Sequence, residues 1–254
     1  MVGIDLSGRT AVVTGASSGM GAETAKVMAR CGARIVAVGR DRERLDATVD
    51  AINAAGGEAT GIQTDLAEDA CHAEIVAHAT EGGAGIDILA LAAGHFVNTP
   101  LGETPIEQFD ELWRVHVRSP FLLLQAALDH LNDGASVLFF SSTVATSGFA
   151  PYAPYTAVKG AIESMARSLA VELAPRVRVN VMAPGFTATP MVGRQVDAWP
   201  ELEGAIVQRT PMGFMGGPEH VAHLAAYLSS DLGAYVDGAR MVVDGGWTAQ
   251  GWQA

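Results

Sequence analysis

Thr10-Ala-Val-Val-Thr14-Gly15-Ala-Ser-Ser-Gly19-Met-Gly21 is the stretch that decides the fold of this chain. Its first five residues form a short apolar run of strand type, and residues 22–31, which follow the glycines, have helical periodicity. Strand, glycine turn and helix in this order is the context that a dinucleotide-binding turn requires. Gly15 permits the tight turn, Gly19 lets the backbone approach a pyrophosphate, and Gly21 permits close packing of the helix on the strand.

The alternation of strand and helix continues along the rest of the chain. Further strands are predicted over residues 33–38, 58–64, 86–92, 135–141, 176–182 and 239–243, and helices over 41–55, 68–80, 105–131, 155–172 and 218–228. This order predicts one doubly wound α/β domain with a parallel sheet, spanning residues 1–254. Residues 186–217 are predicted to be irregular, and a loop of this length inside a compact domain is typical of a substrate lid.

Composition excludes several classes of function. The chain has 254 residues and a formal net charge of −12, which argues against nucleic acid or an anionic membrane surface as a partner. The two cysteines, Cys31 and Cys71, offer neither a disulfide framework nor a cysteine-based metal site, and no metal is predicted. Because we find no signal peptide and no apolar stretch of membrane-spanning length, we expect a cytoplasmic protein.

The segment Tyr155-Thr-Ala-Val-Lys159 carries the candidate chemistry. Positions i and i+4 share one face of a helix, so the phenol is expected beside the ammonium, which would lower the pKa of the tyrosine from about 10. Ser142 follows the predicted strand 135–141 and is expected in the crevice where open α/β sheets bind ligands. A hydroxyl, a phenol and a lysine suit the reduction of a carbonyl or the oxidation of an alcohol. None of them can carry a hydride, so a cofactor is required.

Taken together, these residues resemble the classical short-chain dehydrogenase/reductase family, and the match covers nearly the whole chain, from Leu6 to Gly246. It rests on motifs in a fixed order, which are Thr14-Gly-Ala-Ser-Ser-Gly-Met-Gly21, Asp65, Ser142, Tyr155-x-x-x-Lys159, Asn180, Pro184-Gly185 with Thr187 and Thr189, and Asp244-Gly-Gly246.

The resemblance implies a Rossmann-type fold that binds NAD(P)(H), with Tyr155 as general acid and base. It also implies that Lys159 contacts both the nicotinamide ribose and the tyrosine, and that Ser142 orients the substrate oxygen. The cofactor-binding residues that it implies are Gly15, Ser17, Ser18, Gly19, Met20, Gly21, Asp65, Leu66, Ala93, Gly94, Tyr155, Lys159, Pro184, Gly185, Thr187 and Thr189.

Two positions depart from the family pattern. Where the family usually has Asn-Asn-Ala-Gly, this chain has Leu91-Ala-Ala-Gly94, and His116 replaces the asparagine that usually completes a catalytic tetrad. In the family the main-chain carbonyl at the second position holds a water that relays protons, so we expect catalysis to survive the replacement of the side chain. Two alternatives remain open: His116 relays protons through its side chain, or it is a packed helix residue without a role.

The cofactor preference is predicted from the end of the second strand. A carboxylate there binds the ribose hydroxyls of NAD, whereas this chain has Gly39 followed by Arg40. A glycine leaves room for a 2′-phosphate and a guanidinium can pair with it, so NADP(H) is favoured and NAD(H) remains possible.

The substrate is predicted to be a small apolar or aromatic carbonyl or alcohol. The candidate contacts, apart from Ser142, are the large apolar residues of the cleft and the lid, Phe96, Phe149, Tyr152, Met191, Trp199 and Phe214. Two other functions are considered: a catalytically silent NADP-binding protein that serves as a sensor or assembly subunit, and a 3-ketoacyl reductase acting on an acyl-carrier protein. The resemblance also implies a homotetramer through the helices that begin near Pro105 and Tyr152, with Phe121, Leu124, Met165 and Leu169 expected on their outer faces.

Overall fold

A single parallel sheet forms the centre of the computed structural model, which describes residues 3–250. Its seven strands lie in the order β3-β2-β1-β4-β5-β6-β7 and every neighbouring pair is parallel. The strands are β1 (Thr10–Thr14), β2 (Arg34–Gly39), β3 (Glu58–Gln63), β4 (Ile86–Leu91), β5 (Leu131–Phe140), β6 (Val177–Pro184) and β7 (Arg240–Val243). The doubly wound α/β fold is therefore confirmed. The strand order reverses between β1 and β4, and this switch point is where such sheets open a crevice at their carboxyl ends.

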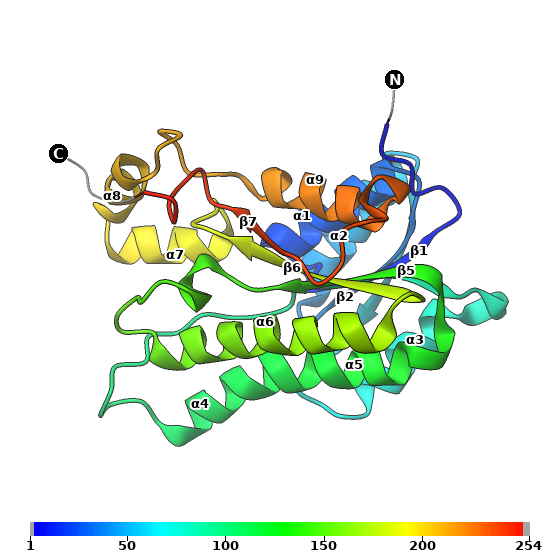
Figure 1. Cartoon of the computed structure of the whole chain (residues 1–254), viewed down its shortest axis with the longest axis horizontal. Coiled ribbons are helices and arrows are strands. Elements are labelled where there is room, and N and C mark those ends of the chain that lie inside the picture. Colours follow the sequence, from blue (N-terminus) through cyan, green and yellow to red (C-terminus); the bar gives the residue numbers. More distant parts are fainter. Residues whose placement is uncertain (1–2, 251–254) are drawn as a thin grey trace.

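Helices cover both faces of the sheet (Figure 1). One face carries α1 (Gly19–Arg30), α2 (Arg42–Ala54) and α9 (Pro218–Ser229), and the other carries α3 (Cys71–Ala79), α4 (Ile106–Trp113), α5 (Ser119–Ala127) and α6 (Ala153–Leu173). Each face has its own apolar core, because successive strand residues point to opposite sides of the sheet. Val12 belongs to the core under α3 to α6, whereas its neighbour Val13 belongs to the core under α1, α2 and α9.

The helix predicted over residues 105–131 is interrupted, which corrects that prediction. A π-helical turn, Arg114–Arg118, separates α4 from α5. Pro120 gives a physical reason, because proline has no N–H and cannot supply the hydrogen bond that the His116 carbonyl would accept in a regular α-helix. Such π-turns are frequent at functional sites.

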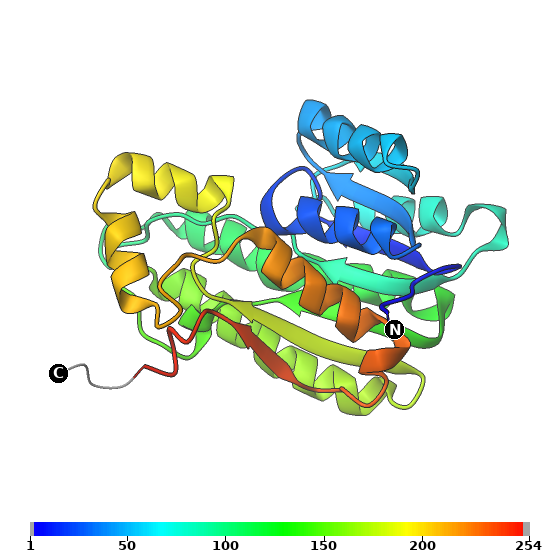
Figure 2. The same ribbon diagram turned by 90° about the horizontal axis from the view of Figure 1, so that it is seen from above.

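The segment 186–217, predicted to be irregular, contains two helices. They are α7 (Pro190–Ala198) and α8 (Leu202–Arg209), and they share a small core of Val192, Leu202 and Ile206. Figure 2 shows them together at one end of the molecule, beside the C-terminal segment. Gly193 and Gly204 weaken the helical pattern in the sequence, whereas Pro190 at the first position of α7 is a start signal that the prediction overlooked.

Within residues 3–250 none of the helices combines the length and the apolar character that a membrane crossing needs.

The contact of α1 with β1 predicts the effect of adding one methyl group. A Cβ on Gly21 would lie 2.4 Å from the carbonyl oxygen of Gly15, so Gly21→Ala should destabilise the fold by about 1–3 kcal/mol. The matched control is Gly204→Ala in α8, where a Cβ meets nothing within 4 Å and better helix propensity should stabilise by up to about 1 kcal/mol. Urea unfolding monitored by circular dichroism measures both variants, and equal midpoints would contradict the prediction.

Candidate active site

A cavity of about 240 Å³ lies at the switch point of the sheet. It is enclosed by the turn before α1, by the segments that follow β2, β3 and β4, and by the start of α7. Its lining residues are Gly15, Ser17, Ser18, Gly19, Met20, Gly21, Gly39, Arg40, Asp41, Arg44, Thr64, Asp65, Leu66, Ala92, Ala93, Gly94, His95, Val115, Thr189, Pro190, Met191 and Arg194. We call it the dinucleotide cavity below.

The turn before α1 fits an anionic pyrophosphate. Gly15 and Gly19 have φ angles of 70° and 58°, a region that glycine enters without strain. Ser18 caps α1 without a side-chain hydrogen bond, and the first turn of the helix carries no acidic residue. The first N–H groups of α1 are therefore free of a side-chain cap, and the helix dipole favours negative charge at this point.

Two arginine side chains line the dinucleotide cavity beside the end of β2. Arg40 lies with Nη1 3.6 Å from Oδ2 of Asp65, and Arg44 places Nη2 2.7 Å from Oδ2 of Asp41. Ser17 packs closely on Gly39, because a Cβ on this glycine would lie only 3.0 Å from the Cβ of Ser17. Both pairs are exposed to solvent and therefore contribute little stability, so a ligand phosphate can compete for these guanidinium groups.

A second, smaller cavity of about 80 Å³ adjoins the first. Met20, Thr189 and Met191 line both, so the two spaces share a wall. The other lining residues of this substrate cavity are Phe96, Ser141, Ser142, Thr143, Val144, Phe149, Tyr155, Pro184, Gly185, Phe186, Thr187, Val192 and Gln195. The surface is mainly apolar, and Ser142 and Tyr155 bring the candidate catalytic hydroxyls to it.

Tyr155 is enclosed by aromatic rings. Phe96 packs edge-on to it with the ring centres 4.9 Å apart, and His116 does the same at 5.5 Å. Burial raises the pKa of Tyr155, which is the reverse of the lowering predicted from Lys159. The phenolate is an anion that loses its hydration in this environment, and here that cost outweighs the effect of the nearby lysine.

The ammonium of Lys159 forms its hydrogen bond with a main-chain carbonyl and not with the hydroxyl of Tyr155. Its Nζ donates a hydrogen bond of 2.7 Å to the carbonyl of Phe140 and lies 5.4 Å from the centre of the Tyr155 ring. Burial lowers the pKa of Lys159 to about 7. The helical spacing placed the two residues on one face correctly, but the charge of the lysine depends on its burial and not on the spacing.

His116 lies in the π-turn and is buried, with 3% of its surface exposed. Its Nε2 lies 2.8 Å from the carbonyl oxygen of His95 and 3.2 Å from the main-chain nitrogen of the same residue. Burial, reinforced by the positive charge of Lys159, holds the pKa of His116 well below its usual value. The imidazole is therefore neutral at the pH of ordinary assays.

Most of the residues predicted for the site line one of the two cavities. Ser142, Tyr155, Phe96, Phe149, Met191, Pro184, Gly185 and Thr187 line the substrate cavity, and the predicted residues of the glycine turn, with Arg40, Asp65, Leu66, Ala93, Gly94 and Thr189, line the dinucleotide cavity. Lys159 and His116 lie behind these walls.

Three residues predicted to contact the substrate lie outside the substrate cavity. Trp199 follows the last residue of α7 and is 53% exposed, and Phe214 is also exposed. Tyr152 packs behind the wall, with its ring centre 4.3 Å from that of Phe96.

The sequence prediction missed several lining residues. Val192 and Gln195 face the substrate cavity together with Met191, as positions i, i+1 and i+4 of α7. Gly193 within this helix weakens the helical pattern of the sequence, so the spacing of these positions does not stand out. His95 and Arg194 line the dinucleotide cavity and carry no motif that singles them out.

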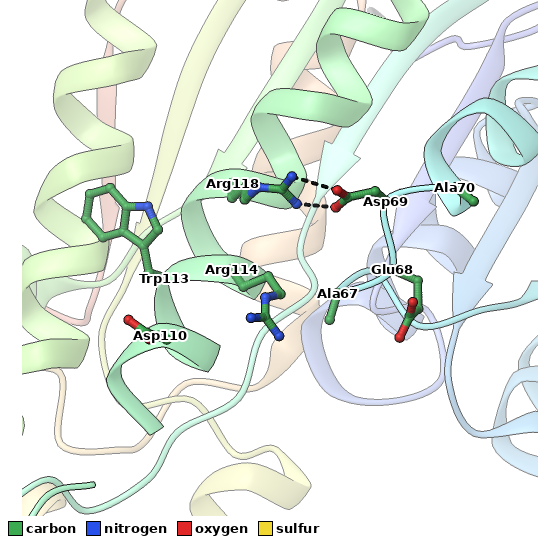
Figure 3. Close-up of a pocket in the computed structure, with 8 residues that line it drawn as sticks. All are labelled: Ala67, Glu68, Asp69, Ala70, Asp110, Trp113, Arg114 and Arg118. Atoms are coloured by element: carbon green, nitrogen blue, oxygen red, sulfur yellow. Dashed lines mark hydrogen bonds and ion pairs between the residues drawn. The ribbon is translucent and has the colours of Figure 1, made fainter. Parts of the chain in front are cut away.

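A third depression, of about 700 Å³, lies outside this site (Figure 3). Arg118 and Asp69 face each other across it in a bidentate ion pair, with Nη2 2.7 Å from Oδ2, and Arg114 and Trp113 lie beside them. It shares no lining residue with the other two cavities. Among the described residues no group of three or more histidine, cysteine, aspartate or glutamate side chains is arranged to hold a metal ion.

The sequence of this chain matches a known family and characterised relatives. Residues 15–248 match the family described as enoyl-(acyl carrier protein) reductase. The 3β-hydroxysteroid dehydrogenase 1 of Eggerthella lenta is 36% identical over 249 residues, which are 96% of this chain and 95% of that protein.

Solved structures of known proteins also resemble this chain over nearly its whole length. A short-chain dehydrogenase/reductase from Brucella melitensis, described as a glucose/ribitol dehydrogenase, has a TM-score of 0.92 at 30% identity and is covered, like this chain, over 100% of its length. A blue fluorescent protein from a metagenomic library, in complex with NADPH, has a TM-score of 0.89 at 32% identity, with 96% of this chain and 99% of that chain covered. The chain therefore belongs to the short-chain dehydrogenase/reductase family, a family of NAD(P)-dependent oxidoreductases.

Proposed function

We propose that this protein is an NADP(H)-dependent enzyme that interconverts an apolar ketone and a secondary alcohol, with Tyr155 as general acid and base. The observation that carries the proposal is the shared wall of the two cavities, with Ser142 and Tyr155 facing the smaller one. This arrangement brings a candidate proton donor and an oxygen-binding hydroxyl next to the space for a dinucleotide.

A nicotinamide held at the wall that the two cavities share would supply the hydride of the proposed reduction. Ser142 donates a hydrogen bond to the carbonyl oxygen of the substrate and holds it in place. Tyr155 transfers its proton to that oxygen while the carbon receives the hydride, so a ketone becomes a secondary alcohol and the tyrosine becomes a phenolate. Protonated Lys159 stabilises this phenolate, and in the oxidation of an alcohol the same groups act in reverse.

The preference for NADP(H) rests on charge at one end of the dinucleotide cavity. Arg40 and Arg44 line this end, and position 39, at the end of β2, is a glycine and not a carboxylate that would repel a 2′-phosphate. The relative solved in complex with NADPH supports the same preference. NAD(H) remains the alternative, because Asp41 and Asp65 line the same end and pair with the two arginines.

The substrate class follows from the lining of the substrate cavity. Phe96, Phe149 and Phe186 form aromatic walls, and Met191 and Val192 on α7 lie at the same space. Such a surface suits a ring or chain of apolar carbon, in agreement with the steroid named for the relative from Eggerthella lenta. We further propose that residues 186–217 act as the lid that closes over the substrate.

Two other functions are less well supported. An acyl-carrier protein is acidic and needs exposed basic partners near the lid, and residues 186–217 offer only two basic side chains, the exposed Arg194 and Arg209. A silent cofactor-binding protein has no need of Ser142 and Tyr155 in one cavity. Oxidation of NADPH in the presence of a panel of ketones, followed at the nicotinamide absorbance band, separates the silent protein from the enzyme.

We propose a homotetramer as the assembly. In the isolated chain Ile106, Phe109 and Trp113 are exposed along one face of α4, at positions i, i+3 and i+7, and Phe121 is exposed on α5. Leu124 was expected on this surface, but it is 3% exposed and belongs to the chain's own core. Leu124 lies with Leu123 and Ala127 on the buried face of α5, whereas Phe121 lies on its exposed side.

Tyr155→Phe tests the proton transfer. The variant keeps the ring and its packing against Phe96 and His116 but removes the acidic hydroxyl, so turnover should fall by roughly 10²–10⁴ while the affinity for NADPH stays near that of the wild type. Steady-state rates and fluorescence titration of NADPH measure the two properties. Activity like that of the wild type would refute the mechanism.

Arg40→Ala tests the preference for NADP(H). Loss of a charge-assisted pair with the 2′-phosphate should weaken NADPH binding by roughly ten- to a hundredfold and leave NADH binding nearly unchanged. Arg42→Ala is the matched control, because Arg42 is also exposed and paired, to Asp46, but does not line the dinucleotide cavity. Equal losses for NADPH and NADH, or equal losses in the two variants, would mean that Arg40 is only a solvated surface residue.

Trp113→Glu tests the assembly. A charge on the apolar face of α4 should dissociate the proposed tetramer, because an unpaired carboxylate is costly to bury. Light scattering at micromolar concentration should give a tetramer for the wild type and a smaller species for the variant. A wild-type protein that is a stable monomer would refute the proposed assembly.

A further inference from the structure

The imidazole of His116 is a buried group that the proposed mechanism does not use. It comes from the π-turn between α4 and α5 and reaches the segment that follows β4. It lines neither of the two adjoining cavities, so it does not contact a ligand there directly. Two of its contacts are Gly94 and His95, and both of these residues line the dinucleotide cavity.

Within residues 3–250, the hydrogen bonds of His116 all go to the main chain of one residue. Nε2 lies 2.8 Å from the carbonyl oxygen of His95 and 3.2 Å from its main-chain nitrogen. A neutral imidazole nitrogen either donates or accepts, so each tautomer makes one of these bonds. Within the described part of the chain, Nδ1 is buried and has no partner, so Nε2 is the only nitrogen that ties the ring to its surroundings.

The ring also fills the space next to Gly94. A Cβ on this glycine would lie 2.3 Å from Cε1 and 2.9 Å from Nδ1 of His116, so no other residue fits there without moving the ring. On its other side the ring packs edge-on to Tyr155, with the centres 5.5 Å apart. One side chain therefore stands between the wall of the dinucleotide cavity and the candidate catalytic tyrosine.

We propose that His116 is a positioning residue for the dinucleotide, which holds the Gly94–His95 main chain in the conformation that the cofactor contacts. The inference rests on the proposed function of the cavity. The two alanines that precede Gly94 offer no polar side chain to fix this segment, and His116 supplies the hydrogen bond from the neighbouring helix. Its removal should therefore affect cofactor binding more than the rate of the chemical step.

The test compares three variants of the full-length protein. His116→Phe keeps the ring volume and removes both nitrogen atoms, whereas His116→Gln keeps a polar group at a similar distance from the backbone. His72→Phe is the matched control, because His72 is equally buried, with 3% exposed, and its ring nitrogens bond Ser119 and Asp69 away from the Gly94–His95 segment. Fluorescence titration gives the Kd for NADPH, steady-state rates at saturating NADPH give kcat, and thermal unfolding reports the fold.

We expect His116→Phe to raise the Kd for NADPH roughly tenfold, the effect of losing one buried hydrogen bond, with kcat within about threefold of the wild type. His116→Gln should restore most of the affinity. His72→Phe should lower the unfolding temperature as His116→Phe does but leave the Kd within about twofold.

Three results would overturn the inference. The first is a folded His116→Phe variant that binds NADPH like the wild type. The second is a His72→Phe variant that loses as much affinity, which would make the loss a general effect of destabilisation. The third is a wild-type protein that binds neither NADPH nor NADH, and this result alone would overturn the proposed function as well.

Discussion

The close approach of α1 to β1 is the constraint on which the rest of the structure depends. The carbonyl oxygen of Gly15 occupies the place where a side chain on Gly21 would begin, 2.4 Å from its virtual Cβ. Because the helix starts this close to the strand, its first N–H groups lie at the carboxyl edge of the sheet, where the strand order reverses. The position of the dinucleotide cavity therefore follows from one backbone contact in the first βα unit.

Burial controls the electrostatics of the site more than the pairing of charges does. Tyr155 and Lys159 lie one helical turn apart, yet the pKa of the phenol is raised and that of the lysine is lowered to about 7. Each shift favours the neutral form, as desolvation requires. A neutral phenol lies in this apolar environment at low cost, and a phenolate that develops on it during the reaction would interact strongly with the ammonium form of Lys159.

The departures from the family pattern are neighbours in space. His116 in the π-turn and the segment Leu91-Ala-Ala-Gly94 are far apart in the chain, but the imidazole packs directly on Gly94. Pro120 disturbs the helix one turn after His116. It has no N–H, so it cannot donate the hydrogen bond that the His116 carbonyl would accept in a regular α-helix. The unusual histidine therefore lies at an irregular point of the helix, where its ring can reach the segment after β4.

The sequence by itself determined the order of the elements, the parallel sheet and most residues of the glycine turn, because hydrophobic period and glycine spacing are local properties of the chain. The two helices within residues 186–217, the break at Pro120 and the exposed position of Trp199 needed the structure. The directions of the pKa shifts of Tyr155 and Lys159 and the contact of His116 with Gly94 also depended on it. Burial and contacts between distant segments arise only when the chain is packed, so no local pattern of residues specifies them.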